Sequence, residues 1–417
     1  MRNVDIVIIG GGSAGMAAAI SAKQNGASSI LVLERDIEMG GILEQCIHNG
    51  FGLQIFKEEL TGPAFAERLF DELVDLNIEY QTESTVLSIS NDKIVEYVNP
   101  IDGYLKVQAK AIILACGCYE RSRGAISLPG KRLKGVYTAG AAQKYLNLED
   151  ILVGKRVFIL GSGDIGLIMA RRMTLEGAKV LAVAELMPYS NGLTRNIVQC
   201  LNDYNIPLYL SHTVLNIDGN DRLEKVTIAE VDENKQFIPG TEKEFEVDTL
   251  LLSVGLIPES TLAEDLGIDL DPRTKGPIVN EKLETNIGGI FACGNALHVH
   301  DLVDFVTLEA REAGLNAARY INEKFSVSNY VNCQPADNVS YVLPQKLNLN
   351  CTTDVTFSFR VRKPLKASTI EVYDGDTLIK TIKKRYMLPS EMERLILRKN
   401  DISKIKHELI FKVRDMQ

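Results

Sequence analysis

The stretches DIVIIGGGSAG (residues 5–15) and RVFILGSGDIG (156–166) decide the fold, because each is an apolar run that ends in a glycine-rich turn. Each turn leads directly into a segment with the pattern of a helix, SAGMAAAISAKQNG (13–26) after the first and DIGLIMARRMTLEGA (164–178) after the second. A glycine-rich turn between a strand and a helix is typical of dinucleotide-binding β-α-β units. The sequence therefore predicts two such units in one chain.

A second apolar run follows each helix and ends in a glutamate, Glu34 in the first copy and Glu185 in the second. The spacing from the first glycine of the turn is the same, 34 − 10 = 24 and 185 − 161 = 24 residues. In such units the glycines let the backbone approach a pyrophosphate, and the acid accepts hydrogen bonds from ribose hydroxyls. The helix N-terminus offers N–H groups to the phosphates. Two copies with one spacing favour two dinucleotide sites over glycine turns that are purely structural.

The charge at the second site indicates which nicotinamide dinucleotide it takes. The carboxylate of Glu185 would repel a 2′-phosphate, and no arginine follows within the next few positions. NAD(H) is therefore favoured over NADP(H), with Arg195 as the residue that would reverse this preference if its loop turned back.

Bulk properties set limits on the class of protein. A chain of 417 residues predicts two or three domains. A net charge of −9 argues against a nucleic-acid surface. No apolar run approaches the roughly 20 residues of a membrane span, and the first strand begins too early for a signal peptide. Seven cysteines without the dense spacing of a secreted scaffold indicate a reducing compartment, so we expect a cytoplasmic protein.

Three more passages carry a resemblance to a known family. AIILACGC (111–118) and DTLLLSVGLIP (248–258) are apolar strands with glycine turns, and TNIGGIFACGNALHVHD (285–301) is another strand–glycine–helix passage. With them the chain resembles the two-dinucleotide flavoproteins, which include thioredoxin reductase and the pyridine nucleotide-disulfide oxidoreductases, over residues 1 to about 325. The resemblance implies FAD at the first turn and NAD(H) at the second. In the family's last FAD motif, Thr285, Phe291, Ala292 and Gly294 match, and Asn295 replaces the usual aspartate.

The expected fold is α/β, with two Rossmann-like three-layer dinucleotide-binding domains and a small C-terminal all-β domain. The NAD-binding domain (119–258) is inserted between the two parts of the FAD-binding domain (1–118 and 259–326). Residues 330–417 contain short strands separated by turn residues, which predicts a small antiparallel, immunoglobulin-like sandwich.

The resemblance also implies the cofactor-binding residues of both sites. For FAD they are Gly10, Gly12, Ser13, Ala14, Gly15, Glu34, Gly41, Gly117, Gly294, Asn295 and Asp301. For NAD(H) they are Gly161, Gly163, Asp164, Ile165, Gly166, Glu185 and Gly255.

The cysteine pair of disulfide-reducing relatives is missing from both places where the family carries it. Before the second turn, the run GVYTAGAA (135–142) has Ala139 and Ala142 at those positions. After the first acid, the run GGILEQCIH (40–48) has Leu43 and His48 there. We therefore do not expect an ordinary disulfide reductase.

The remaining candidates for catalysis are Cys46, His48, His298 and His300. Cys46 lies near the position of the redox thiol in single-cysteine NADH oxidases, peroxidases and coenzyme A-disulfide reductases, and a lowered pKa would let it shuttle electrons. Packing beneath the flavin is the alternative, and His48 has an alternative as a hydrogen-bonded loop residue. The sequence HVHD (298–301) opens a helix, and we interpret its histidines and Asp301 as flavin-pocket residues and not as metal ligands. No metal site is expected.

A narrower resemblance suggests where electrons go. The linking segments look like those of the FAD- and NAD-binding α subunits of dye-linked proline dehydrogenase and of opine and sarcosine oxidases. They also look like oxidoreductases associated with a glycerol-3-phosphate-dehydrogenase-like flavoprotein and a small cysteine-rich or iron–sulfur protein. Such a second flavoprotein subunit and such a small protein are the expected partners. A self-contained single-cysteine NADH oxidase and a non-catalytic nucleotide-bound scaffold remain as alternatives.

Overall fold

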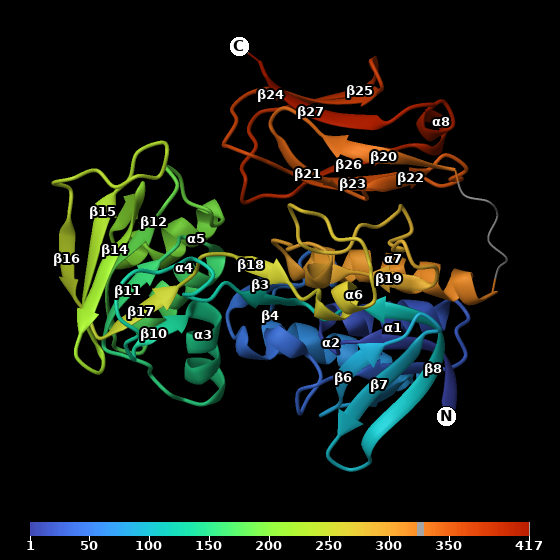
Figure 1. Cartoon of the computed structure of the whole chain (residues 1–417), viewed down its shortest axis with the longest axis horizontal. Helices are drawn as coiled ribbons and strands as arrows, with labels where there is room; N and C mark the ends of the chain where they lie inside the picture. Colours follow the sequence, from blue (N-terminus) through green and yellow to red (C-terminus); the bar gives the residue numbers. More distant parts are fainter. Residues whose placement is uncertain (323–328, 417) are drawn as a thin grey trace. The chain divides into compact units, whose positions relative to one another are not determined.

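The computed structural model describes residues 1–322 and 329–416. The chain forms two compact units, the first made of Met1–Cys118 with Ile257–Gln417 and the second of Tyr119–Leu256 (Figure 1). The chain leaves the first unit within β9 (Cys118–Glu120) and returns within β18 (Leu256–Pro258). No helix among the described residues combines the length and the apolar character that crossing a membrane requires.

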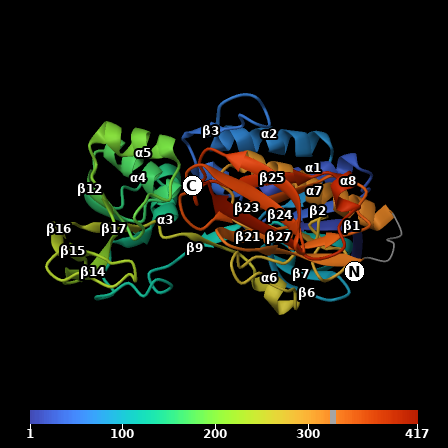
Figure 2. The same ribbon diagram turned by 90° about the horizontal axis from the view of Figure 1, so that it is seen from above.

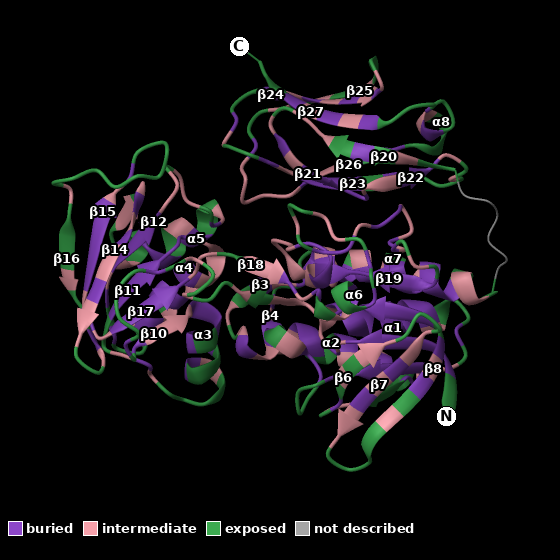
Figure 3. Cartoon of the chain, viewed as in Figure 1, coloured by how far each residue is buried: buried purple, intermediate pink, exposed green. Residues whose placement is uncertain are grey.

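The first unit is built on a parallel sheet with the strand order β5-β2-β1-β8-β19. These strands are β5 (Glu79–Gln81), β2 (Ile30–Leu33), β1 (Arg2–Ile9), β8 (Gly103–Leu114) and β19 (Ile290–Ala292), and β7 (Ile94–Asn99) and β6 (Thr85–Ile89) continue the sheet antiparallel. The end of β8 and most of β1 are buried on both faces (Figure 3), which explains their continuous apolar runs.

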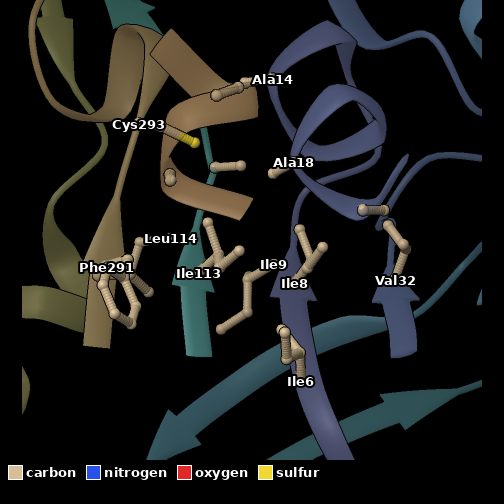
Figure 4. Close-up of a cluster of buried hydrophobic side chains, with 14 of the residues drawn as sticks. Ile6, Ile8, Ile9, Ala14, Ala18, Val32, Ile113, Leu114, Phe291 and Cys293 are labelled. Carbon is tan, nitrogen blue, oxygen red and sulfur yellow. The ribbon is translucent and has the colours of Figure 1, made fainter. Parts of the chain in front are cut away.

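Helices α1 (Ser13–Gln24) and α7 (Val303–Asn322) pack together over this sheet, and α2 (Gly62–Asp75) lies beside α1. A Cβ atom at Gly314 of α7 would lie 2.1 Å from the carbonyl oxygen of Ala18 in α1. Glycine and alanine at this crossing therefore let the two backbones approach closely. Figure 4 shows the resulting core, in which Ile8 of β1, Ile113 of β8 and Phe291 of β19 come together with Ala14 and Ala18.

The second unit repeats the arrangement with the order β10-β17-β11-β12-β13, all parallel. The strands are β10 (Val136–Thr138), β17 (Thr249–Leu252), β11 (Arg156–Leu160), β12 (Lys179–Glu185) and β13 (Leu208–Leu210); the main helices are α3 (Ala139–Leu148), α4 (Asp164–Leu175) and α5 (Thr194–Cys200). An antiparallel sheet of β14 (His212–Gly219), β15 (Leu223–Glu230) and β16 (Lys243–Glu246) completes the unit. The strand order reverses at β1 in the first unit and at β11 in the second, the strands that lead into the two glycine turns, and open α/β sheets bind ligands at this point.

The C-terminal part is all-β apart from the short helix α8 (Lys399–Ile402). One sheet contains β22 (Lys346–Asn348), β20 (Tyr330–Pro335), β27 (Leu409–Asp415), β24 (Ser368–Asp374) and β25 (Thr377–Lys384); the other contains β21 (Val339–Leu343), β23 (Val355–Val361) and β26 (Glu393–Leu397). Phe357 of one sheet packs on Phe411 of the other with ring centroids 4.9 Å apart (Figure 2 views this part from above). The predicted α/β fold with two Rossmann-like sheets is confirmed. The prediction that the C-terminal sandwich is antiparallel is wrong at one pair, because β20 and β27 are parallel, and its immunoglobulin-like character stays a prediction.

Candidate functional site

The first glycine turn is closed at its ends and open in its middle. A Cβ at Gly10, where φ is +107°, would lie 2.3 Å from the carbonyl oxygen of Ala115, and one at Gly15 would lie 1.8 Å from that of Gly10. At Gly12 the nearest atom to a Cβ would be the carbonyl oxygen of Gly40, at 3.8 Å. The turn therefore leaves room at its middle glycine, where a pyrophosphate has to approach the backbone.

Two further features of this turn suit a phosphate and a ribose. Helix α1 begins directly after Gly12, and no described side chain caps it, so its first N–H groups are left for a ligand. The carboxylate of Glu34 accepts hydrogen bonds from the N–H of Gly11 (2.6 Å) and of Asp36 (2.8 Å). These bonds orient Glu34 at the turn and leave other lone pairs for ribose hydroxyls.

The second turn has the same geometry. A Cβ at Gly161 (φ +98°) would lie 2.0 Å from the carbonyl oxygen of Ser253, whereas one at Gly163 would have its nearest neighbour, the Ser253 hydroxyl, at 3.3 Å. Gly166 packs on Ser253 and donates its N–H to the Ser253 hydroxyl at 3.0 Å. Glu185 accepts hydrogen bonds from the N–H (2.9 Å) and the hydroxyl (2.7 Å) of Ser162. The structure thus contains two dinucleotide cradles that differ in detail.

The predicted NAD-site residue Asp164 holds the loop that follows the second acid. Its Oδ1 accepts hydrogen bonds from the N–H of Leu193 (2.8 Å) and the side-chain amide of Asn196 (2.6 Å). Ile165 is the next residue of α4 and is partly buried. Gly255 has φ +104°, and its carbonyl accepts the N–H of Arg121 at 3.0 Å.

Several of the predicted FAD residues come together around the first turn, although they are distant in sequence. A Cβ at Gly41 would lie 3.2 Å from the Cα of Gly12, and one at Gly294 would lie 2.8 Å from the Cβ of Ala14. The side chain of Asn295 accepts the N–H of His300 (3.0 Å), and its amide nitrogen lies 3.6 Å from the sulfur of Cys118. Ser13 is the first residue of α1, and Gly117, with φ +73°, has no described atom within 4 Å of a Cβ position.

The seven cysteines all lie within the described residues, and none of them is in a disulfide bond within this chain. Burial raises the pKa of Cys46 to about 12, which favours the unreactive thiol over the thiolate. Ala139 and Ala142 are fully buried in the second unit, and Leu43 is buried as well. His48 contacts the ring of Phe51, and its Nδ1 lies 3.2 Å from the carbonyl oxygen of Asn49.

His298 and His300 lie together with a residue that sequence reasoning missed, Glu309 of α7. Nε2 of His298 is 2.8 Å and Nε2 of His300 is 3.3 Å from Oε2 of Glu309, and both imidazole side chains are only 1% exposed. Burial would raise the pKa of Glu309, but the two imidazoles outweigh it and hold that pKa below its usual range. Burial also lowers the pKa of His298. These shifts favour the carboxylate form of Glu309 and the neutral form of His298.

Contacts from the C-terminal β part reach the same region. The hydroxyl of Tyr341 lies 3.3 Å from Nδ1 of His298, and burial raises the pKa of Tyr341 to about 12, so the hydroxyl keeps its proton. Asp301 forms an ion pair with Arg360 and accepts the N–H of Met392 at 2.7 Å. The structure therefore places Asp301 in a contact with the β part, and its predicted contact with FAD stays a prediction.

Asp304 is a second residue that sequence reasoning missed. It lies in the first turn of α7 and is buried, and its carboxylate accepts the N–H groups of Gly52 (3.1 Å), Gln54 (2.8 Å) and Ile55 (2.9 Å). It thereby fastens the segment after Cys46 to the start of α7. An acidic residue at a helix start was the available signal, but the sequence does not say which loop it binds.

Two strand–glycine-turn–helix units on parallel sheets, each with an oriented acid, define a two-dinucleotide-binding protein. Residues 4–319 match the model of the family "Pyridine nucleotide-disulphide oxidoreductase", and the chain belongs to this family. The family is one of oxidoreductases that bind FAD and NAD(P)H, and both cradles fit these groups.

Known relatives agree with this assignment. The chain is 24% identical to the ferredoxin–NADP reductase of Picrophilus torridus over 339 residues, which are 78% of this chain and 97% of that protein. It is 27% identical to an opine oxidase subunit of Agrobacterium tumefaciens over 321 residues, 70% of this chain and 61% of that one. The crystal structure of T. acidophilum thioredoxin reductase is similar to this chain with a TM-score of 0.62 and 24% identity. The alignment covers 76% of this chain and 98% of the thioredoxin reductase chain.

Proposed function

We propose that the protein is an FAD-dependent NADH dehydrogenase without a redox dithiol, which exchanges electrons with a separate partner subunit. The observation that supports this proposal is the burial of the apolar residues Ala139, Ala142 and Leu43, which the resemblance places at three of the four family positions for the redox cysteines. His48 occupies the fourth. A flavin reduced by NADH then needs an acceptor other than a disulfide of this chain.

The residues of the two turns have separate tasks in this proposal. Gly12 and the start of α1 hold the FAD pyrophosphate, and Glu34 bonds the ribose. Gly163, the start of α4 and Glu185 do the same for the nicotinamide dinucleotide. FAD supplies the chemistry that accepts a hydride and passes electrons on, and the protein supplies binding, orientation and a suitable electrostatic environment.

The preference for NADH follows from the second acid. Both oxygens of Glu185 are held by N–H groups, Oε2 by Ser162 and Oε1 by Met187 at 2.9 Å, so the carboxylate is fixed at the turn. A fixed negative charge where the ribose binds disfavours the 2′-phosphate of NADPH. Arg195 lies in the first turn of α5, between Leu193 and Asn196, which both donate hydrogen bonds to Asp164 of the second turn. Its loop therefore turns back to the cradle, and Arg195 is the residue that would oppose this preference.

The partner class comes from the narrower resemblance. The opine oxidase relative is by its name one subunit of an enzyme. We propose the same role here, with a second flavoprotein dehydrogenase subunit, of the glycerol-3-phosphate type, and a small cysteine-rich or iron–sulfur protein as partners. We expect the assembly to be cytoplasmic.

An anaerobic stopped-flow experiment tests the proposal. The full chain, loaded with FAD, is mixed with NADH, and flavin absorbance is followed before and after oxygen or a dye acceptor is added. Fast bleaching, slow reoxidation by oxygen and fast reoxidation by the dye support the proposal. Rapid oxygen consumption would instead indicate a self-contained oxidase, and no bleaching would indicate a nucleotide-bound scaffold.

A further inference from the structure

Three residues that bind metals well lie together at the start of α7. The cluster consists of His298, His300 and Glu309, and one ligand atom from each lies within 4.8 Å of the others. Two imidazoles and one carboxylate form the donor set of several zinc and ferrous-iron sites. In a tetrahedral zinc site with bonds of about 2.1 Å, neighbouring ligand atoms are about 3.4 Å apart. The distances of 2.8 and 3.3 Å from the two imidazoles to Glu309 need only small side-chain adjustments to reach this.

The burial and the incomplete hydrogen bonding of His300 are the independent observation that points to a ligand. Its side chain is 1% exposed, Nδ1 has no hydrogen-bond partner among the described residues, and Nε2 makes only the 3.3 Å contact with Glu309 and no hydrogen bond of good geometry. A buried imidazole without a hydrogen bond is costly, because its polar atoms have lost water without compensation. Its Nε2 lies 3.3 Å from Oε2 of Glu309, so that nitrogen is directed into the cluster.

The other two residues are already oriented by outer contacts. Nδ1 of His298 lies 3.3 Å from the hydroxyl of Tyr341, and Oε1 of Glu309 accepts the N–H of Gly294 at 2.8 Å. In metal sites, the second nitrogen of a ligating histidine is usually held in this way, which fixes the ring for coordination.

Contrary to the sequence-based expectation of no metal site, we infer that His298, His300 and Glu309 bind one first-row divalent cation, Zn²⁺ or Fe²⁺. The cation joins the segment after Asn295 to the second turn of α7. The imidazoles of the site are buried, and its three ligands come from 12 consecutive residues (298–309). The inference does not depend on the proposed function, since it concerns only which atoms hold the ion.

Metal analysis of the full chain tests the inference. The FAD-loaded protein is prepared without a histidine tag, from cultures supplemented with zinc or, anaerobically, with iron, and is passed over a chelating resin. Mass spectrometry should find about one ion per chain in the wild type and less than about a tenth of that in His300→Ala and Glu309→Gln. The two media distinguish zinc from iron. Retention of the metal by both variants would overturn the assignment.

His407→Ala is the matched control, because this imidazole is exposed and lies next to Asp374, far along the chain from the cluster. It should keep the wild-type metal content. Flavin absorbance and thermal unfolding show whether each variant is folded. Co²⁺ added to the metal-stripped wild type gives a second readout, since coordination by two imidazoles and a carboxylate produces visible d–d bands. A wild-type protein with neither bound metal nor cobalt bands would overturn the inference, whether or not the variants fold.

Discussion

Replacing Gly12 by alanine should weaken FAD binding while leaving the apo protein folded. The structure separates these two effects because the nearest atom to a Cβ at Gly12 would be 3.8 Å away, an ordinary van der Waals distance. The backbone there has φ −73° and ψ −172°, which an alanine adopts without strain. The new methyl group would point into the space that a pyrophosphate needs.

The expected change in the free energy of unfolding is clearly smaller than the expected change in the free energy of FAD binding. Glycine to alanine at a compatible position stabilises by about 0.4–1 kcal/mol through the unfolded chain, and alanine is a poorer helix N-cap than glycine by a similar amount. The unfolding free energy of the apo protein should therefore change by less than about 1 kcal/mol. Displacing the pyrophosphate from one charged hydrogen bond costs about 1.5–3 kcal/mol, which is roughly a 10–150-fold loss of FAD affinity.

The assay is a titration of apo protein with FAD, followed by quenching of flavin fluorescence, together with urea unfolding of the apo protein. Gly15→Ala is the matched comparison, because its Cβ would lie 1.8 Å from the carbonyl oxygen of Gly10 and must distort the turn. We expect Gly15→Ala to lower both stability and FAD affinity, and Gly12→Ala to lower affinity alone. Wild-type FAD affinity in Gly12→Ala would refute the assignment of this turn to the FAD pyrophosphate.

Four other substitutions test other parts of the chain. Glu185→Ala should raise the KM for NADH by about 10–150-fold, the equivalent of one charged hydrogen bond, and reduce the discrimination against NADPH. The matched Glu34→Ala should instead weaken FAD retention, and equal effects of both variants on NADH kinetics would argue against separate sites. Cys46→Ser should leave flavin reduction by NADH intact, because burial raises the pKa of the thiol to about 12 and no thiolate is available to relay electrons. Uptake of four electrons per flavin by the wild type, falling to two in the variant, would contradict this. Arg360→Ala should lower the unfolding free energy by about 3–5 kcal/mol by leaving Asp301 without its cation, and full stability in urea would show that the pair contributes nothing.

The fold could be predicted because its deciding signals are local. Each glycine turn, its helix and its acid lie within a few tens of residues, and the chemistry of each position follows from the requirements of one turn. Gly10 and Gly161 need positive φ, and both have it, at +107° and +98°. Equal spacing to Glu34 and Glu185 then gave a second, independent match. Local pattern was sufficient here because consecutive elements of a β-α-β unit usually lie next to each other and their connection is right-handed.

The cluster at the start of α7 could not be predicted, because His298 and His300 precede the helix and the third member, Glu309, lies within it. The sequence HVHD (298–301) suggested a pair of imidazoles, and nothing in it indicated that Glu309 would face them. The contacts from Tyr341 and Arg360 come from strands 40 residues or more further along the chain. Such contacts depend on how the C-terminal sheets pack, and no periodicity in the sequence encodes that.

The duplication also shows how one device is adapted to two ligands. The residue after the first glycine is Gly11 in one turn and Ser162 in the other, and each donates its N–H to the acid. The Ser162 hydroxyl donates a further hydrogen bond to Glu185. A serine at position 11 could not make the same hydrogen bond without moving a neighbour, because its Cβ would lie 2.5 Å from the sulfur of Met39. With about four acceptor sites on a carboxylate, Glu34 keeps about two for a ligand and Glu185 about one. The first cradle therefore offers its ribose more hydrogen bonds than the second, which suits a cofactor that stays bound in the first and a substrate that must leave in the second.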